Sequence, residues 1–471
     1  MNILLINPPW TVRTGNIWNL IAGVVPPLGL AQLAAYLEQF GLTVTILDTQ
    51  AERISLSDLG KKLAAFSFIP DFIGLTATTS IIRQATETAH ICKNHFPSAK
   101  IVLGGVHPSI FPRETLSDGC VDFVIRREGE ESFHALVSGT PPAEISGLSF
   151  KLNGTVVHNK DRDEIPDINK LPMPAYHLLP MDKYRPALGS YKQLPGIGIV
   201  TTRGCPGKCT FCFGNYLGMR VRMRSADNIF KEISLLHAKY GIREISFYDD
   251  TFTAVKSNVL EFCILMEKSS LNISWSCFAR VDFIDETLLT AMKAAGCHQI
   301  CFGVESGSEE ILNNIKKKTS LNKAKQAVEL TKKFKIEART AFMLGNPGET
   351  AETMRQTLDF ALKLDSDIAL FNVTTPYPGT EMFTWADEHA LLKTKDWSKY
   401  DLSHQILDVP GLTQNEIQEF YNHAYKAFYL RPSYLFRRLL KITNIHTLRM
   451  CLRIFKALFR LLLNPKSQDT P

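Results

Sequence analysis

The first 140 residues alternate short apolar runs with longer amphipathic stretches. The amphipathic stretches include residues 28–40 and 80–96, where apolar positions recur with helical spacing. Strands that alternate with helices form parallel sheets, because each crossover helix returns the chain to the same end of the sheet. The pattern predicts a doubly wound, Rossmann-like α/β domain over residues 1–140. Its expected strands are residues 3–6, 43–47, 72–76, 101–103 and 122–125.

A second alternation of strands and helices occupies residues 191–400, which we take as a second domain. Its expected helices include residues 226–239 and 285–295. The stretch in between, residues 141–190, is polar and rich in proline, which restricts the backbone to extended conformations, so we predict a linker there. The six strands expected in the second domain are residues 197–201, 244–248, 273–278, 299–304, 338–344 and 368–374.

Length and composition indicate a globular protein of more than one domain. The chain has 471 residues, of which 45% are hydrophobic, and the charges are mixed. It begins with a strand-like run in place of a basic leader, so we expect no signal peptide. No uninterrupted apolar run reaches about 18 residues, so we expect no transmembrane helix.

The net charge of +6 is concentrated in the C-terminal region, residues 401–471, which has a helical pattern. From Arg431 onward there are nine Lys and Arg residues and one acid, which leaves about −2 for the rest of the chain. The basic character therefore does not indicate a nucleic-acid-binding body, and we expect no nucleic-acid partner. Apolar residues interleave with these cations, as in helices that lie on membrane surfaces, although such a face more often packs on its own protein. The apolar residues are Leu439, Leu440, Leu452, Ile454, Phe455, Leu458, Phe459 and Leu461.

Three of the ten cysteines stand close together after the first strand of the second domain. Cys205, Cys209 and Cys212 are spaced by four and three positions, and Phe211 precedes the last of them. Four cysteines would complete a zinc site or a [4Fe–4S] cluster, whereas three leave one iron of such a cluster without a protein ligand. The alternative is a zinc site with a distant fourth ligand. The other cysteines lie in apolar patterns and are expected in the core, which suits a reducing cytoplasm.

The spacing of this triad, with the aromatic residue before its last cysteine, resembles the signature of the radical S-adenosylmethionine (SAM) superfamily. The resemblance implies a [4Fe–4S] cluster whose open iron is chelated by the amine and carboxylate of SAM. An electron from the cluster then breaks the S–C5′ bond and yields a 5′-deoxyadenosyl radical. The resemblance also implies that the six βα units form a partial (β/α)6 barrel, whose active residues gather at the carboxyl ends of the strands.

The ends of the later strands carry further matches to the superfamily, which imply a SAM site. Asp249 and Asp250 follow the second strand, and either carboxylate would accept the methionine ammonium; alternatively, they cap the next helix. Arg280 follows the third strand and would face the methionine carboxylate, or form a surface salt bridge. The remaining residues assigned to SAM by this resemblance are Phe211, Glu305, Ser306 and Gly345.

The first domain is similar to the cobalamin-binding domain that precedes the barrel in class B radical SAM enzymes. Ligands of doubly wound sheets bind at the carboxyl ends of the strands. Many cobalamin domains supply a histidine from an Asp-x-His-x-x-Gly loop, which is missing here, so any bound cobalamin should be base-off and without a histidine ligand. The alternative is a domain that kept the fold and lost the cofactor. The residues assigned to cobalamin are Asn7, Pro8, Thr76, Gly104, Gly105, His107, Glu128 and Gly129.

Together these resemblances imply an enzyme similar to the anaerobic magnesium-protoporphyrin monomethyl ester cyclase and radical SAM methyltransferase group. In methylating members a second SAM remethylates the cobalamin, and methylcobalamin delivers the methyl group to a substrate radical at an unactivated carbon. Two alternatives are a cobalamin-independent radical SAM enzyme and a non-catalytic iron–sulfur electron-transfer protein. A methylthiotransferase acting on tRNA would need a second cysteine triad, yet only Cys92 and Cys120 precede residue 200.

The partners and the location are expected from the resemblances, from the free thiols and from the basic helical pattern of the C-terminal region. We expect a small-molecule or lipid-like substrate, and a reductant such as a flavodoxin or ferredoxin. We expect a cytoplasmic protein that contacts the membrane surface, if at all, through its basic C-terminal helices.

Overall fold

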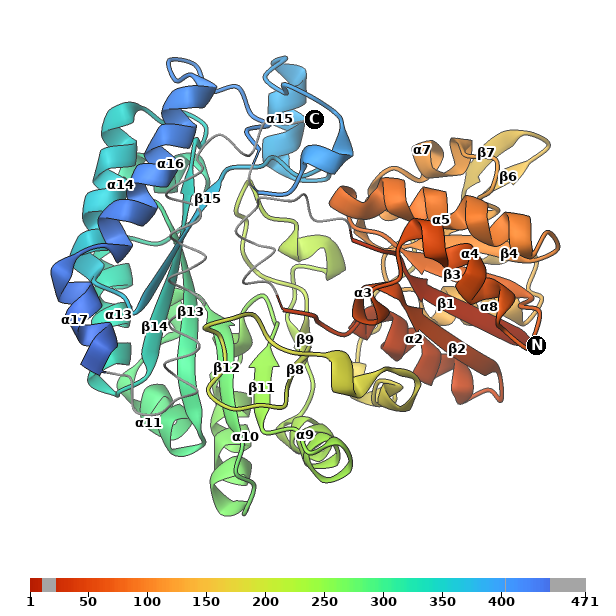
Figure 1. Ribbon diagram of the computed structural model, residues 1–471, viewed down its shortest axis with the longest axis horizontal. Coiled ribbons are helices and arrows are strands. Elements are labelled where there is room, and N and C mark those ends of the chain that lie inside the picture. Colours follow the sequence, from red (N-terminus) through yellow and green to blue (C-terminus); the bar gives the residue numbers. More distant parts are fainter. Residues whose placement is uncertain (11–22, 403, 441–471) are drawn as a thin grey trace.

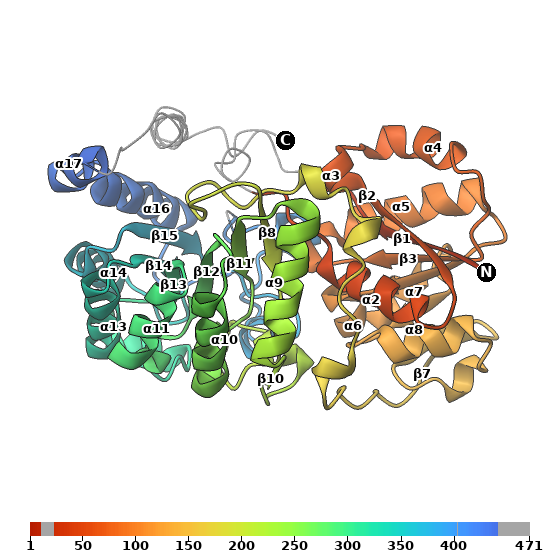
Figure 2. The same cartoon turned by 90° about the horizontal axis from the view of Figure 1, so that it is seen from below.

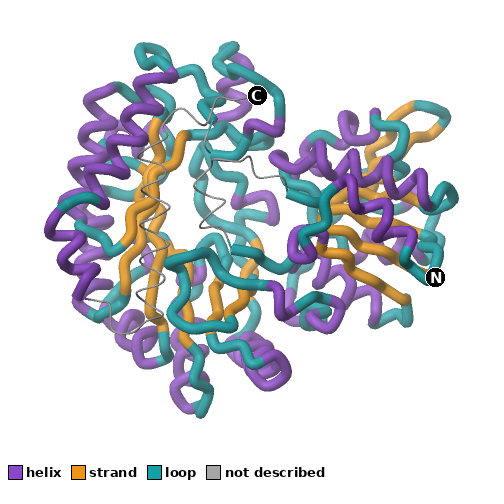
Figure 3. Tube along the Cα trace, viewed as in Figure 1, coloured by secondary structure: helices purple, strands orange, loops and turns teal. Residues whose placement is uncertain are grey.

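The computed structural model describes residues 1–10, 23–402 and 404–440. The chain forms two α/β bodies that lie side by side, each built on its own sheet (Figures 1 and 3). The N-terminal body carries a seven-stranded sheet, and the larger C-terminal body carries a six-stranded parallel sheet. This arrangement is the α/β architecture expected from the two alternations in the sequence.

The first sheet has the strand order β2-β1-β3-β4-β5-β6-β7, and its first five strands are parallel. Alternate residues of β1 point to opposite faces, so that Ile3 and Leu5 join one core cluster while Leu4 and Ile6 join another. Helices α2 and α8 cover the first face, and α4 and α5 cover the second. The parallel strands are β1 (Asn2–Asn7), β2 (Thr43–Asp48), β3 (Phe72–Thr76), β4 (Lys100–Gly104) and β5 (Phe123–Ile125).

The helices of this body lie in the connections that follow its parallel strands, as in a doubly wound sheet. Helix α4 begins after Ser55, whose side chain accepts a hydrogen bond from the Asp58 N–H and so satisfies a free donor of the first turn. The helices are α2 (Leu28–Glu38), α3 (Thr49–Glu52), α4 (Leu56–Ala64), α5 (Ile82–His95), α6 (Val106–Ile110), α7 (Pro112–Ser117) and α8 (Glu130–Val137).

The stretch 141–190, for which the sequence predicts a linker, contributes two strands to the first sheet. Strand β6 (Leu148–Leu152) pairs antiparallel with β5, and β7 (Thr155–His158) pairs antiparallel with β6. The sheet therefore extends past residue 140 as a hairpin. The rest of the stretch contains short 3-10 turns and crosses to the second body, where Tyr176 donates a hydrogen bond to Glu232.

The second sheet has the strand order β15-β14-β13-β12-β11-β8, all parallel, and forms a partial barrel. Helices α9, α10 and α11 lie along its outside (Figure 2). Large side chains fill the layer between strands and helices, among them Phe247, Phe262 and Trp275. The strands are β8 (Gly196–Ile199), β11 (Glu244–Phe247), β12 (Ser274–Ala279), β13 (Cys297–Glu305), β14 (Glu337–Leu344) and β15 (Ile368–Val373).

The helices of this body begin at conventional caps. Thr350 and Thr353 form a capping box at the start of α14, and Thr413 and Glu416 form another at the start of α16. The helices are α9 (Ala226–Tyr240), α10 (Lys256–Lys268), α11 (Glu286–Ala294), α12 (Glu309–Asn314), α13 (Leu321–Lys333), α14 (Ala351–Leu364), α15 (Glu381–Glu388), α16 (Gln414–Tyr429) and α17 (Pro432–Leu440).

Helix α16 covers the open edge of the barrel sheet. The hydroxyl of Tyr425 donates to the Phe371 carbonyl and accepts from the Phe371 N–H, at 3.0 and 3.2 Å. The hydroxyl of Tyr429 makes the same pair of bonds with Ala369, at 2.7 and 3.2 Å. Backbone groups of the edge strand β15 that would otherwise stay unpaired are thus satisfied by side chains.

Helix α17 exposes a row of apolar side chains. Phe436, Leu439 and Leu440 are each more than 60% exposed. The other apolar residues of the basic tail, Leu452, Ile454, Phe455, Leu458, Phe459 and Leu461, lie outside the described residues. Among the helices of the described ranges, none combines the length and the hydropathy needed to cross a membrane.

Candidate functional site

The three clustered cysteines lie on one loop at the carboxyl end of β8. The loop is closed at its base by two short antiparallel strands, β9 (Thr202–Arg203) and β10 (Arg222–Met223). Gly204 has a φ of 86°, and a Cβ there would overlap the carbonyl oxygens of Gly218 and Arg220, so this turn requires glycine. Backbone bonds also hold the loop to the barrel, since the Thr210 N–H donates to the Ile315 carbonyl at 3.0 Å.

The three thiols are unpaired and gather on this loop. The Sγ atoms of Cys205 and Cys209 lie 3.4 and 3.8 Å from where a Cβ of Gly207 would stand. Burial raises the pKa of Cys212 to about 11, and Asp250 and the other two cysteines add to the rise. A bound iron would favour the thiolates. The donor set, three sulfurs on one tight loop, fits a cluster that keeps one iron open.

The two aspartates after β11 have different environments. Asp249 is buried, and its carboxylate accepts hydrogen bonds from the backbone and hydroxyl groups of both Thr201 and Thr202, at 2.5–2.8 Å. Burial raises the pKa of Asp249 to about 6, and these bonds oppose the rise. Because its hydrogen-bonding capacity is occupied, Asp249 fixes the start of the cysteine loop.

Asp250 is the aspartate that faces the cysteines. One of its carboxylate oxygens lies 3.2 Å from where a Cβ of Gly214 would stand, and the Cys212 sulfur lies 3.3 Å from the same point. The side chain is exposed on the loop surface. Its position makes it the better candidate for the methionine ammonium, where the sequence left the choice open.

Replacing Asp250 by asparagine should weaken SAM binding by about ten- to a hundredfold, because a charge-assisted hydrogen bond contributes roughly 1.5–3 kcal/mol. The measurement is SAM affinity by equilibrium dialysis on the anaerobically reconstituted protein, with iron content as the control. Asp227→Asn, on the exposed side of α9, is the matched substitution and should leave the affinity unchanged. Equal SAM affinity in wild type and the Asp250 variant would exclude this role.

Arg280, Glu305 and Phe211 also lie beside the cysteine loop. One guanidinium nitrogen of Arg280 lies 3.9 Å from the Cys209 sulfur, and the other donates to Asp282 at 2.9 Å and to the Lys317 carbonyl at 2.8 Å. Glu305 is buried and forms an ion pair with Lys317 at 2.7 Å. The Lys317 ammonium lies 5.9 Å from the centre of the Phe211 ring.

Lys317 was not anticipated from the sequence. Burial alone would lower the pKa of Lys317, but Glu305 and the nearby Cys209 thiol raise it overall, so the ammonium stays charged. A buried Glu305 therefore has a partner within the protein and does not by itself require a SAM hydroxyl. Lys317 is the middle residue of a run of three lysines, 316–318, where nothing in the sequence distinguishes it from a solvated surface residue.

The contacts of Ser306 and Gly345 indicate packing roles. Ser306 hydrogen-bonds Thr357 of α14 at 3.1 Å and accepts from the Ser308 N–H. Gly345 has a φ of 80°, and its nearest side-chain neighbour is Ile417 of α16. These positions shape the turns at the ends of β13 and β14.

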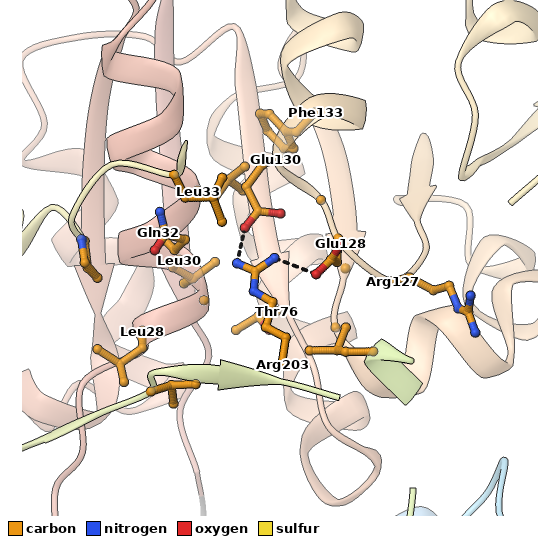
Figure 4. A pocket seen from close by; sticks show the side chains of 18 of the residues that line it. Leu28, Leu30, Gln32, Leu33, Thr76, Arg127, Glu128, Glu130, Phe133 and Arg203 are labelled. Carbon is orange, nitrogen blue, oxygen red and sulfur yellow. Dashed lines mark hydrogen bonds and ion pairs between the residues drawn. The ribbon is translucent and has the colours of Figure 1, made fainter. Parts of the chain in front are cut away.

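A cavity of about 320 Å³ lies at the carboxyl edge of the first sheet, facing residues 200–203, which follow β8 and include β9 (Figure 4). Five of the residues assigned to cobalamin line it: Thr76, Gly104, Gly105, Glu128 and Gly129. Its inner wall is apolar and is formed by residues such as Leu5, Leu33 and Phe133. The two glycines leave the edge free of side chains, which suits the close approach of a flat ring.

Asn7 and Pro8 do not line this cavity. They form hydrogen bonds with residues at the end of β2 and the start of α3. The Asn7 amide donates to the Asp48 carboxylate at 2.8 Å, and the Pro8 carbonyl accepts from Gln50 at 2.9 Å. His107 is also absent from the lining. It is fully buried among Phe111 and Trp397, and its Nδ1 lies 3.3 Å from the Thr79 hydroxyl. Its loop turns into α6, which carries the ring away from the sheet edge.

Burial lowers the pKa of His107 from 6.5 to about 4. Since the folded pKa is depressed, the stability linked to neutral His107 is full above pH 6.5 and is lost as the pH falls towards 4. At pH 5 the loss should be about 2 kcal/mol. Denaturant unfolding at pH 7.5 and pH 5 should show a smaller difference for His107→Leu than for wild type or His95→Leu, an exposed control. An equal effect of pH on the stability of all three proteins would contradict a lowered pKa of His107.

Comparison with known proteins gives two family matches. The radical SAM superfamily matches residues 199–361, and the B12 binding domain family matches residues 18–137. An uncharacterised methyltransferase of Pyrococcus horikoshii is 39% identical over 443 residues, which cover 93% of this chain and 94% of that protein. The anaerobic magnesium-protoporphyrin IX monomethyl ester cyclase of Rubrivivax gelatinosus is 26% identical, over 92% and 78% of the two chains.

One solved structure extends the likeness to the whole fold. The radical SAM methyltransferase TsrM of Kitasatospora setae, with cobalamin and a [4Fe–4S] cluster bound, is 18% identical and has a TM-score of 0.70. The match covers 92% of this chain and 89% of TsrM. Two bodies joined in this order are therefore a fold shared with that protein.

Proposed function

Because the chain belongs to the cobalamin-binding group of the radical SAM superfamily and is an enzyme of that group, we propose that it methylates an unactivated carbon of a small-molecule substrate. The observation that supports the proposal most directly is the position of the cysteine loop. The loop that carries the three thiols also contributes Arg203, Tyr216 and Leu217 to the lining of the cavity at the edge of the cobalamin-type sheet. Methylation is favoured over cyclisation because the relative at 39% identity is described as a methyltransferase.

The cofactors fit the residues that the chain offers them. Cys205, Cys209 and Cys212 would hold a [4Fe–4S] cluster, which with SAM supplies a 5′-deoxyadenosyl radical. Gly104, Gly105 and the 128–129 turn at the cavity edge would hold cobalamin, which would supply a carrier for the methyl group.

The side chains around the cysteine loop would orient SAM by opposite charges. Asp250 lies on one side of the loop and would accept the methionine ammonium. Arg280 lies beside Cys209, where its guanidinium would face the methionine carboxylate. Lys317 and Glu305 form an ion pair next to the Phe211 ring, so this part of the site carries little net charge.

The test begins with anaerobic purification and reconstitution with iron, sulfide and hydroxocobalamin. Incubation with SAM and dithionite should yield 5′-deoxyadenosine. Incubation with trideuteromethyl-SAM and a metabolite extract should yield a product three mass units heavier than an unlabelled methylated one, together with S-adenosylhomocysteine. A protein with an intact cluster that forms no 5′-deoxyadenosine is an iron–sulfur protein of another class. Label transfer that does not depend on cobalamin would identify the cobalamin-independent alternative.

We extend the proposal to a lipid-like substrate and to a reductant of the flavodoxin or ferredoxin type. The exposed apolar side chains of α17 are typical of a helix that rests on a membrane surface, whereas Arg437 and Arg438 of the same helix pair with Asp365 and Glu337 of the protein. Sedimentation with vesicles of phosphatidylglycerol should retain wild type more than a Phe436→Ser, Leu439→Ser variant. Equal retention of both proteins would show that the apolar side chains of α17 do not mediate membrane contact.

A further inference from the structure

We propose that Arg203 is a positioning residue that couples the cobalamin-binding edge of the first sheet to the cysteine loop. Arg203 lies two residues before Cys205, at the end of β9, yet its side chain extends into the N-terminal body and lines the cavity (Figure 4). The inference rests on the proposed function, since it assigns a coupling between its two cofactor sites.

Arg203 forms ion pairs with two carboxylates of the opposite body. Its Nη1 donates to Glu128 at 2.8 Å and its Nη2 donates to Glu130 at 2.5 Å. All three side chains are largely buried: 16% of Arg203, 5% of Glu128 and 7% of Glu130 are exposed. A buried pair is strongly disturbed when one partner is removed, because the other charge stays behind without compensation.

The second strand of the β9–β10 ribbon is anchored at the same carboxylate. Arg222 pairs with Arg203 across the ribbon, and its Nη1 donates to both oxygens of Glu128 at 3.0 Å and to the Ile165 carbonyl at 2.6 Å. Burial disfavours the charged form of Glu128, but Arg222 and Arg203 outweigh this and hold the pKa of Glu128 below its usual value. Glu128 is therefore an anion committed to the two arginines.

A third contact lies on the other side of the cysteines. The Tyr216 hydroxyl meets the Ser109 hydroxyl at 2.5 Å, and Ser109 accepts from the Arg127 N–H at 3.0 Å. Arg203, before the thiols, is therefore bonded to segment 127–130. Tyr216, after the thiols, is bonded to Ser109, which itself contacts that segment. Segment 127–130 lines the cavity. A ligand that shifts this segment would move the thiols with it.

The consequence is a mutual dependence of cobalamin and SAM binding. In wild type, the Kd of SAM should change about fivefold or more when cobalamin is bound, as coupled sites generally show. In Arg203→Met the ratio of the two SAM Kd values should fall towards one, with iron content unchanged. Arg203→Lys keeps one positive charge and should restore part of the ratio. Arg220→Met, an exposed arginine on the same loop, is the matched control and should keep the wild-type ratio.

The contacts of Arg203 with Glu128 and Glu130, here called the latch, can also be tested without cobalamin and without an activity assay. In the cluster-loaded, cobalamin-free protein, amide hydrogen exchange of residues 204–214 and 127–133 should be about tenfold or more faster in Arg203→Met than in wild type or Arg220→Met. A global loss of stability would raise exchange in the distant helix α14 as well, whereas loss of the latch would not.

Three results would overturn the inference. The first is unchanged hydrogen exchange of both segments in Arg203→Met. The second is a wild-type ratio of SAM Kd values near one, and the third is a ratio that Arg203→Met leaves unchanged. Failure of the proposed function looks different, because a wild type that forms no 5′-deoxyadenosine fails regardless of residue 203.

Discussion

Replacing Cys209 by alanine should abolish formation of 5′-deoxyadenosine and reduce the iron content of the reconstituted protein to background. Cys209 lies between the other two cysteines in the sequence, and its sulfur faces Arg280. The loop offers three thiols for a cluster, so loss of one leaves two ligands, which do not hold a cubane. The fold should survive, because the thiol is only partly buried.

The control is Cys120→Ser, in the N-terminal body. Cys120 is on the loop before β5, and its thiol lies 2.9 Å from Nδ1 of His90. It has no role in the proposed site. It should keep full iron content and full SAM cleavage. Iron and labile sulfide assays, the absorbance near 400 nm and chromatography of the nucleoside product measure the effect. A Cys209→Ala protein with four irons and normal product would refute the cluster assignment.

Replacing Gly105 by valine should eliminate cobalamin retention. Gly105 has a φ of 97°, a region that β-branched residues rarely adopt. A Cβ there would lie 2.8 Å from the Ala77 carbonyl oxygen and 2.9 Å from the Thr76 hydroxyl. The added side chain would therefore distort the β3–β4 edge that lines the cavity. Strain of this kind costs about 1–3 kcal/mol, and direct filling of the cavity adds to the loss.

Gly119→Val serves as the matched control, because nothing lies within 4 Å of its added Cβ and the position is in the same body but not at the cavity. Wild type and Gly119→Val, reconstituted with hydroxocobalamin and desalted, should retain the cofactor with a base-off, histidine-off absorbance spectrum. The Gly105 variant should retain none, with an intact cluster. Retention by the Gly105 variant would place the cobalamin site elsewhere, and no retention by wild type would make this domain a relic.

Most of the fold was predictable, because the strands of both sheets are apolar runs separated by helix-length amphipathic stretches. Strand β3 has the predicted bounds, and each strand of the barrel overlaps its predicted run. The hairpin β6–β7 was missed, since the prolines around it indicate extended coil and its exposed strand β7 shows little apolar character. The hairpin gains its order from the pairing of β6 with β5 and of β7 with β6, which the local sequence pattern does not reveal.

The sequence predicted which site residues follow a strand end, but it did not predict the side-chain contacts that decide their roles. Position along the chain placed Gly104, Gly105 and Glu128 at one edge, but it also placed His107 there, and the start of α6 turns that ring away. Spacing could not separate Asp249 from Asp250, because their difference lies in contacts with Thr201 and Thr202. The ion pairs of Arg203 join residues more than 70 positions apart, and Lys317 is distinguished only by its burial.

The tyrosine hydroxyls of α16 have a consequence for how the protein can be divided. They occupy the hydrogen-bonding positions that a seventh strand would take, so the barrel sheet ends here without an exposed edge. A fragment that stops before Gln414 would leave the backbone of β15 unpaired and free to join the same edge of another molecule. Cutting the chain after its last strand would thus turn a covered sheet edge into a template for aggregation, although every residue of the cofactor sites would still be present.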